Sequence, residues 1–397
     1  MKSRKYYIEN FLIFLNVFSI MFSFIFFNQF YFLIFTLLLS ILIVRPKVIK
    51  IQPVDKKIFF LIFVFMINSF FSFSPTNSLK YVIMFILCCL NIRILFELNV
   101  NWKSKLLNYL WFAVFIHSLC VVIHFIKPNI IYSFLERFYD SNNMMLIKNL
   151  ANLGSYAGIC NQTGLAGFIV SIFIIMSFIK IDFSNKKIMY ILFTFLGFAA
   201  LFLTGKRGFV VFDILMIFLY FLFFQNGNIS KKIIYFMLLI MLAFLGVYIL
   251  SSMGILKSFL NKLIVLQNSN DLSNGRDVLW SKTIDVFRTK PFLGNGINTI
   301  DLLFGDCTHN IYIQLLAELG ILGYWVVVFW FIGNLIDSIK NYLSNKNVYN
   351  ILSLFFQFLF LLYGLTGNPF YSSSFLWIYL LGIFLSEGRS VRKNAER

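Results

Sequence analysis

Long apolar runs recur from one end of the sequence to the other, and they constrain its fold more than any other feature. Each covers about 17 to 22 residues, enough to cross a hydrocarbon core of roughly 30 Å as a helix. The run Phe11–Phe27 is apolar on every side, whereas the strands of an outer-membrane barrel would alternate apolar and polar residues. Only 13% of the residues are charged, against about a quarter in a soluble domain. The sequence therefore predicts an all-α, polytopic transmembrane helical bundle and excludes a soluble fold.

Hydropathy predicts about twelve spans, an even number that places both chain ends on one side of the membrane. We expect these spans at approximately residues 8–27, 29–44, 58–73, 80–97, 106–126, 161–179, 188–204, 209–224, 233–251, 309–336, 351–367 and 370–386.

Basic residues distinguish the two sides of the membrane. The segments on the N-terminal side hold roughly two thirds of the 34 Lys and Arg residues, and such residues concentrate in short cytoplasmic loops. Short connections on the opposite side hold only Lys80, Lys206 and Arg207. Both termini are therefore predicted to be cytoplasmic. The same distribution accounts for the formal charge of +18 without nucleic acid, for which the chain offers no soluble binding domain.

The chain divides into four predicted parts. Residues 1–251 form N-terminal transmembrane helices, and residues 252–308 form a long extracytoplasmic loop that contains short helices, one of them amphipathic. Residues 309–386 form C-terminal transmembrane helices, and residues 387–397 form a cytoplasmic tail. Loops on a rigid scaffold commonly carry function, so we expect the chemistry in the polar loop 252–308.

Part of this loop has the spacing of an amphipathic helix, beginning at Gly275 and ending at Lys290. An apolar face opposite charged residues is typical of a helix that lies along the membrane surface. The apolar positions of this predicted helix are Val278, Trp280, Ile284 and Phe287.

Two arginines of the predicted helix are candidate phosphate ligands. Arg276 and Arg288 could hold a phosphate through bidentate guanidinium contacts, or they could be solvated or contact lipid headgroups. The segment Gly294-Asn295-Gly296 follows. It is either a simple turn or a turn whose backbone N–H groups face an anion.

His309 stands where the loop re-enters the membrane. An imidazole exchanges a proton near neutral pH, which suits a general base acting on a hydroxyl at the outer surface. The alternative is a helix-capping or structural histidine. Glu318 lies roughly two and a half turns deeper, where a carboxylate is costly and faces the protein interior or a partner. Its role is either functional or that of a structural ion pair.

Lys206 and Arg207 occupy a turn between two predicted spans, with almost no loop to solvate them. Charges near membrane depth are candidate functional groups, although both side chains could instead reach the lipid headgroups. Asp213 follows within the next span and could pair with a cation.

The sequence carries no strong metal or cofactor motif. It contains no Walker loop, no Gly-rich dinucleotide motif and no H-E-x-x-H helix. Asp306 and His309, with Cys307 between them, do not match a strong zinc spacing. We therefore expect neither a metal nor a cofactor.

The second half of the chain contains three motifs. In chain order they are Lys206-Arg207-Gly208; Gly275-Arg276-x-x-x-Trp280 with Pro291-x-x-Gly294-x-Gly296; and His309-Asn310-x-Tyr312-x-Gln314-x-x-x-Glu318-Leu319-Gly320-x-x-Gly323. In this order they resemble the motifs of the O-antigen polymerase and O-antigen ligase superfamily of bacterial membrane glycosyltransferases, and the third is the most specific. Asn161-Gln162 also looks like a family feature, with Gln162 where an Asn often stands.

The resemblance implies a metal-independent transfer of an undecaprenyl-diphosphate-linked glycan to a sugar hydroxyl, at the outer face of the bacterial cytoplasmic (inner) membrane. It implies that Arg207 and Arg276 hold the diphosphate and that His309 deprotonates or orients the acceptor. Two guanidinium groups aimed at the developing charge would stabilise the leaving group. The other candidate substrate-binding residues are Lys206, Arg288, Asn310, Gln314, Glu318, Trp280 and Gln162.

We expect a polysaccharide polymerase that lengthens an O-antigen or capsule by moving the growing chain onto the next lipid-linked repeat unit. One alternative is a ligase that attaches the glycan to the lipid A core of lipopolysaccharide. Another is a glycolipid flippase or transporter, which would gather its ionisable groups near the bilayer midplane. The expected partners are the lipid-linked oligosaccharide and the bilayer, with a chain-length regulator and a flippase of the same pathway.

Overall fold

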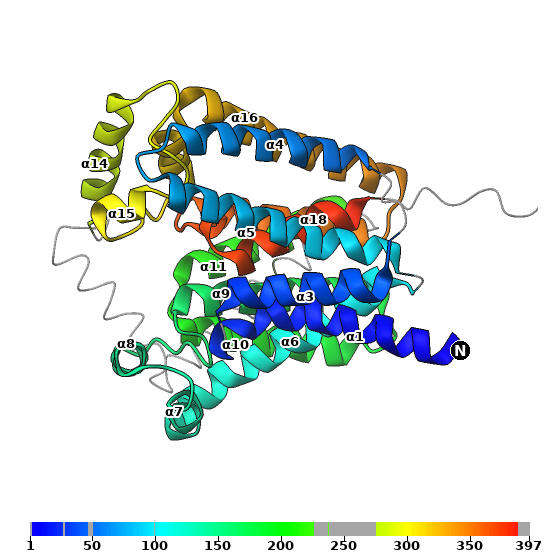
Figure 1. Cartoon of the computed structure of the whole chain (residues 1–397). Helices are drawn as coiled ribbons and strands as arrows, with labels where there is room; N and C mark the ends of the chain where they lie inside the picture. The colour runs from blue at the N-terminus through cyan, green and yellow to red at the C-terminus, as the bar shows by residue number, and fades with distance from the viewer. Residues whose placement is uncertain are drawn as a thin grey trace, which may run out of the picture. The chain divides into compact units, whose positions relative to one another are not determined.

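The computed structural model describes residues 2–26, 28–46, 51–98, 100–225, 237 and 275–387. These residues form helices and no strand, which confirms the predicted all-α class (Figure 1). Most of the predicted span 233–251, residues 252–274 of the polar loop and residues 388–397 of the tail lie outside the described residues. The described chain forms two units, which are treated in turn.

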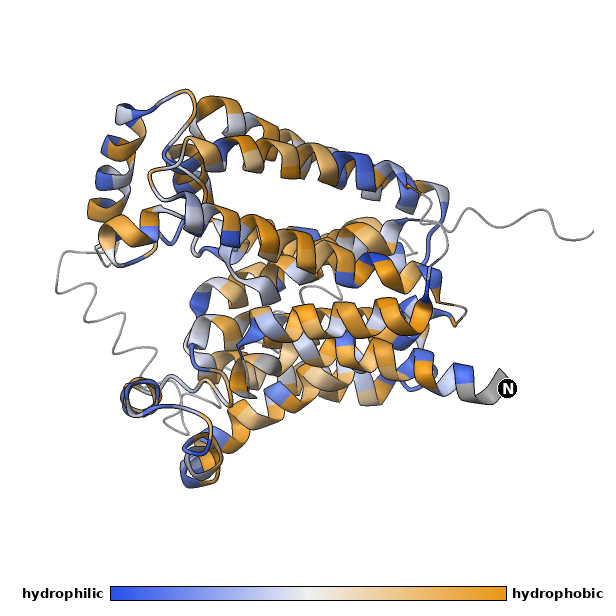
Figure 2. Ribbon diagram, in the orientation of Figure 1, coloured by the Kyte–Doolittle hydropathy of each residue, from blue (hydrophilic) through white to orange (hydrophobic). Residues whose placement is uncertain are grey.

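Six described helices are long and apolar enough to cross a membrane. Three shorter apolar helices add to them, and Figure 2 shows hydrophobic residues along most of their lengths. The predicted number of about twelve spans stays a prediction. The six are α5 with η1 (Pro75–Glu97), α6 (Trp102–Ile126), α9 (Thr163–Phe183), α10 (Lys187–Thr204), α11 (Arg207–Leu219) with η2 (Tyr220–Phe224), and α16 (Ile311–Ser344); the shorter three are α3 (Gln29–Val44), α17 (Val348–Gly364) and α18 (Ser373–Ser386).

Unit 1 comprises Met1–Asn16, Phe30–Leu106 and Trp280–Arg397. Its core is aromatic and centres on Phe370, which is fully buried in the short turn η3 (Pro369–Tyr371). Rings from α5, α16, α17 and α4 (Pro53–Phe70) have their centroids 5.7 to 6.4 Å from that of Phe370. The connection between α17 and α18 is thereby fixed at the centre of the unit.

A polar cluster joins the ends of four helices in the same unit. Arg93 Nε lies 3.1 Å from the carboxylate of Asp55. Lys103 Nζ donates to the carbonyl of Glu387 at 2.5 Å, and the Glu387 side chain accepts from the N–H of Val54 at 3.3 Å. These contacts tie the ends of α4, α5, α6 and α18 together.

Unit 2 comprises Val17–Gln29 and Leu107–Leu279. Its central helix α9 is buried along most of its length, with α10 and α11 packed against it. α10 lies close to α9 at Gly197, where a Cβ would meet the side chain of Ile174 at 2.5 Å. The helices α7 (Pro128–Leu135) and α8 (Ser141–Asn152) lie between α6 and α9 in the sequence and pack their apolar faces together in one buried cluster.

Candidate functional site

α14 (Arg276–Thr289) forms where the sequence predicts a helix in the polar loop. Thr283 is its fully buried residue, while Val278 and Ile284 are exposed. Trp280 Nε1 donates a 2.8 Å hydrogen bond to the backbone carbonyl of Thr308. α14 is therefore anchored to the residue directly before His309.

α16 is interrupted at Gly320, where φ is 63° and ψ is −179°. In an unbroken helix the N–H groups of Ile321 and Leu322 would donate to carbonyls four residues back. Here they donate to the carbonyls of Pro291 (2.8 Å) and Phe292 (3.3 Å). The segment after α14 thus supplies the acceptors that the broken helix lacks.

The two carbonyls released by the break, those of Ala317 and Glu318, accept hydrogen bonds from the turn after α14. The N–H of Asn295 donates to Ala317 at 3.2 Å, and the N–H of Gly296 donates to Glu318 at 2.9 Å. The N–H of Gly294 is bonded to the carbonyl four residues before it. The interpretation of this turn as an anion-binding site is therefore wrong, because the chain itself uses its N–H groups.

Glycines allow these two backbones to touch. A Cβ on Gly294 would overlap the carbonyl oxygen of Glu318, and a Cβ on Gly320 would overlap that of Phe292. Both glycines also have positive φ values, 74° and 63°, which side chains disfavour. Gly294 of the second motif and Gly320 of the third therefore have a structural role.

Glu318 holds the rest of the loop through its buried carboxylate. The backbone N–H groups of residues 298–300 donate to it at 2.7 to 3.0 Å and so cap α15 (Ile300–Phe304). Gln314 Nε2 at 3.0 Å and the Tyr371 hydroxyl at 2.6 Å are further donors. All five donors are neutral, and no ion pair with Glu318 occurs among the residues that the structure describes, so its carboxylate holds the loop through hydrogen bonds.

Asn310 and Gln314 order the entrance of α16. Asn310 Oδ1 accepts from the N–H groups of Tyr312 (3.0 Å) and Ile313 (3.3 Å) and so caps the helix. Gln314 Oε1 accepts from the hydroxyl of Thr308 at 3.1 Å. Both predicted substrate-binding residues therefore fix the backbone on either side of His309.

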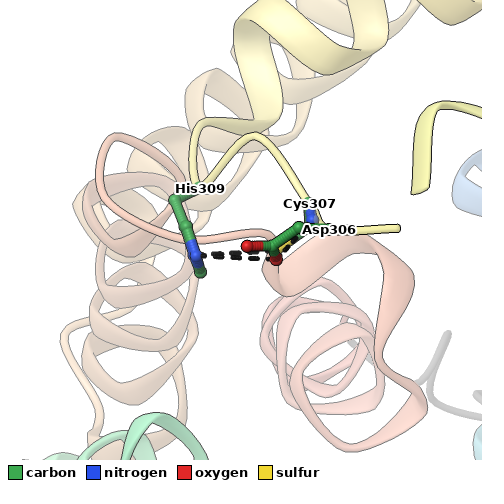
Figure 3. Close-up of side chains that lie close together, drawn as sticks. All are labelled: Asp306, Cys307 and His309. Atoms are coloured by element: carbon green, nitrogen blue, oxygen red, sulfur yellow. Dashed lines mark hydrogen bonds and ion pairs between the residues drawn. The ribbon is translucent and has the colours of Figure 1, made fainter. Parts of the chain in front are cut away.

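His309 lies two residues before α16 in a left-handed backbone conformation, with φ of 53°. Such a φ is uncommon for a residue with a side chain, and the anchored neighbours Thr308 and Asn310 stabilise it. The imidazole is 40% exposed and faces Asp306 and Cys307 (Figure 3). An exposed ring at this position is accessible to a substrate hydroxyl.

Unit 2 holds the remaining motif residues at neighbouring helix ends. Lys206 is exposed and Arg207 is half-buried, at the turn between α10 and α11. The turn packs on α9 at Gly167, where a Cβ would lie 3.3 Å from Cβ of Lys206. Gln162 is exposed at the start of α9. The structure therefore gathers these three candidates at one end of α9, α10 and α11.

Three charged candidates have differing surroundings. Arg276 is half-buried at the start of α14. Arg288 is exposed and pairs with Asp285 at 2.9 Å, which favours the solvated alternative. Asp213 is fully buried in α11, and no ion pair with it occurs among the residues that the structure describes.

Sequence reasoning missed two residues that brace the loop. Asn68 Nδ2 donates to the carbonyls of Leu293 (2.8 Å) and Glu318 (3.1 Å), and its Oδ1 accepts from the N–H of Ile297 (2.8 Å). Tyr371 is the other, through its bond to Glu318. An isolated amide within an apolar run was the available signal for Asn68, since polar groups at membrane depth require partners.

Comparison with known proteins bears on the second half of the chain. Residues 192–328, about a third of the chain, match the model of the O-Antigen ligase family. This range includes every candidate site residue predicted from the sequence except Gln162. No match was found among curated proteins. The match confirms that the chain, over residues 192–328, is related to the O-antigen polymerase and O-antigen ligase superfamily.

Proposed function

We propose that the chain is a polysaccharide polymerase of the bacterial inner membrane, with both termini in the cytoplasm. It transfers a growing O-antigen or capsule glycan from undecaprenyl diphosphate to a hydroxyl of the next lipid-linked repeat unit. The observation that carries the proposal is the placement of His309. Its exposed imidazole is held between two anchored residues at the entrance of α16, inside the range that matches the O-Antigen ligase family.

The proposed reaction is a direct displacement. The acceptor oxygen forms a bond to the anomeric carbon of the donor glycan as the bond from that carbon to the diphosphate oxygen breaks. His309 takes or directs the proton of the acceptor hydroxyl. Arg207 and Arg276 are the proposed ligands of the leaving diphosphate, where fixed cations stabilise the developing negative charge without a divalent ion.

Other residues have proposed supporting roles. Lys206 and Gln162 lie at the same helix ends as Arg207 and would contact the donor. Arg288 is exposed on α14 and would contact donor phosphate or lipid headgroups. Trp280, Asn310, Gln314 and Glu318 would act through the position of His309. Trp280 is bonded to the carbonyl of Thr308, Asn310 caps α16, and Gln314 is bonded to the hydroxyl of Thr308 and to Glu318.

The second candidate function is a ligase that attaches a finished glycan to the lipid A core. The description of the matching family as O-Antigen ligase favours it. Both candidates require the same donor chemistry and differ only in the acceptor, so the acceptor has to be varied in the test.

The test uses the full chain, purified and placed in liposomes with a synthetic undecaprenyl-diphosphate repeat unit in EDTA. Wild type should form a ladder of products, whereas His309→Ala and Arg276→Ala should form none. Arg137→Ala is the matched control, because Arg137 is an exposed arginine outside the motifs and should leave the ladder intact. Each variant should elute and melt as wild type does, since the substituted side chains are not fully buried.

Other results would point elsewhere. A wild-type ladder that persists in His309→Ala would refute the proposed mechanism. Absence of a ladder, with transfer of glycan to added lipid A core, would establish the ligase. Glycolipid crossing the bilayer without any new product would favour the transporter that the sequence left as an alternative.

A further inference from the structure

Three side chains able to bind a metal meet in the loop before α16. The ligand atoms of Asp306, Cys307 and His309 all lie within 4.8 Å of one another. Figure 3 shows the imidazole facing the other two residues. Their spacing in the sequence matches no strong zinc motif. The backbone of His309 is left-handed there, with φ of 53°.

The distance between the sulfur of Cys307 and Nδ1 of His309 suits a tetrahedral ion. Zn²⁺ with bonds of about 2.3 Å to sulfur and about 2.0 Å to nitrogen separates those two ligand atoms by roughly 3.5 Å. Cys307 Sγ lies 3.6 Å from Nδ1 of His309 and 4.0 Å from its Nε2. Oδ1 of Asp306 lies 3.9 Å from Nε2. The Asp306 side chain is 61% exposed, so it can rotate toward an ion without disturbing packing.

We propose that Asp306, Cys307 and His309 form a zinc-binding site. A thiolate, an imidazole and a carboxylate are the donor types that Zn²⁺ takes in proteins, and the sulfur ligand disfavours Mg²⁺ and Ca²⁺. Binding forms a Zn–S bond as the Cys307 thiol releases its proton to solvent. Three protein ligands leave a fourth position for water on the exposed side of the loop.

Zinc at this site blocks the proposed transfer. A ring nitrogen of His309 that donates its lone pair to the ion cannot accept the proton of an acceptor hydroxyl. Zinc is thus an inhibitor, which EDTA removes. This consequence rests on the proposed function, whereas metal binding itself does not.

Binding is tested with the full-length protein in detergent, titrated with Co²⁺ alone and then with Zn²⁺. One equivalent of Co²⁺ should give a near-ultraviolet band from charge transfer between thiolate and metal, and Zn²⁺ should displace it. Cys307→Ser should abolish the band. His309→Ala should weaken Zn²⁺ binding by at least about tenfold, the lower limit for loss of even an outer partner of a ligand. Cys120→Ser, which removes a half-buried thiol of α6 outside the cluster, should preserve both signals.

Wild type without the band, or a band that survives Cys307→Ser, would overturn the proposed site. The inhibition is measured separately, as the ratio of product formed with Zn²⁺ to product formed in EDTA for each variant. Wild type should show a low ratio and Cys307→Ser a ratio near one. Zinc that binds without lowering this ratio would refute the inhibition. A wild type that makes no product in EDTA would refute the proposed function and leave the binding result standing.

Discussion

The hydroxyl of Tyr371 donates a 2.6 Å hydrogen bond to Oε2 of Glu318, joining the connection between α17 and α18 to the carboxylate of α16 that holds residues 298–300. A phenol is protonated at physiological pH, so the hydroxyl is the donor in this contact. The core of unit 1 is in this way linked to the backbone that positions His309.

Glu318→Gln should destabilise the protein and abolish product formation. The substitution replaces one acceptor oxygen with an NH₂ group that meets the N–H groups of residues 298–300, and each buried donor left without a partner costs about 1–3 kcal/mol. Tyr371→Phe removes one of five donors and should cost about 1 kcal/mol. Thermal unfolding in detergent measures both variants, and an equal loss of stability in the two would contradict the proposed positioning role.

Gly320→Ala should be strongly destabilising. Its Cβ would overlap the carbonyl of Phe292, and its φ of 63° disfavours any side chain, so we expect a cost above about 1–3 kcal/mol. Gly333→Ala, in the same helix, is the matched control because its Cβ would meet only Lys57 Nζ at 3.6 Å. It should be neutral, or stabilising by about 0.5–1 kcal/mol, since Ala favours helix over Gly. Similar melting temperatures for the two variants would contradict the close backbone contact between Gly320 and Phe292.

Trp280→Phe should slow product formation with little loss of stability. The variant keeps an aromatic ring but loses the hydrogen bond to Thr308, which contributes roughly 1 kcal/mol or a factor of about five in rate. Trp325→Phe, at an exposed position of α16, should leave the initial rate unchanged. The positioning role predicts a lower kcat with a nearly constant KM, and an effect confined to KM would argue instead for substrate contact.

Glu387 should make stability depend on pH. Loss of solvation raises the pKa of its carboxyl group from 4.5 to about 7, opposed by the hydrogen bond from Val54. The folded chain therefore binds this proton more tightly than the unfolded chain, so stability falls as pH rises from about 5 to about 8. Glu387→Gln should flatten this part of the profile of melting temperature against pH, whereas Glu136→Gln, at an exposed carboxylate, should keep the wild-type slope.

Hydropathy predicted the long helices because a span requires a continuous apolar run whatever its neighbours. The expected spans at 309–336, 351–367 and 370–386 correspond to α16, α17 and α18. It could not predict the break at Gly320, since the composition of α16 remains apolar across it. The break depends on hydrogen bonds to residues almost thirty positions away, which no local pattern records.

The site residues could be named from the motifs, but their physical roles could not. The sequence shows Glu318 only as a carboxylate at membrane depth, where it is costly. Its five neutral donors come from separate parts of the chain, so the motif alone does not predict them. The cluster of Asp306, Cys307 and His309 comes from residues within four positions of one another. Common zinc spacings such as C-x2–4-C and H-x3–5-H do not include this set, so they miss it.

The pairing of Pro291 and Phe292 with the break in α16 also constrains how the protein is made. Translation delivers residues 291–296 before Gly320 leaves the ribosome. Backbone N–H groups exposed at the break would be costly in hydrocarbon if they lacked acceptors, but their acceptors are already present in the nascent chain. We therefore expect α16 to insert while residues 291 and 292 of the preceding loop bind to it, because their carbonyls accept the hydrogen bonds that α16 cannot make within itself.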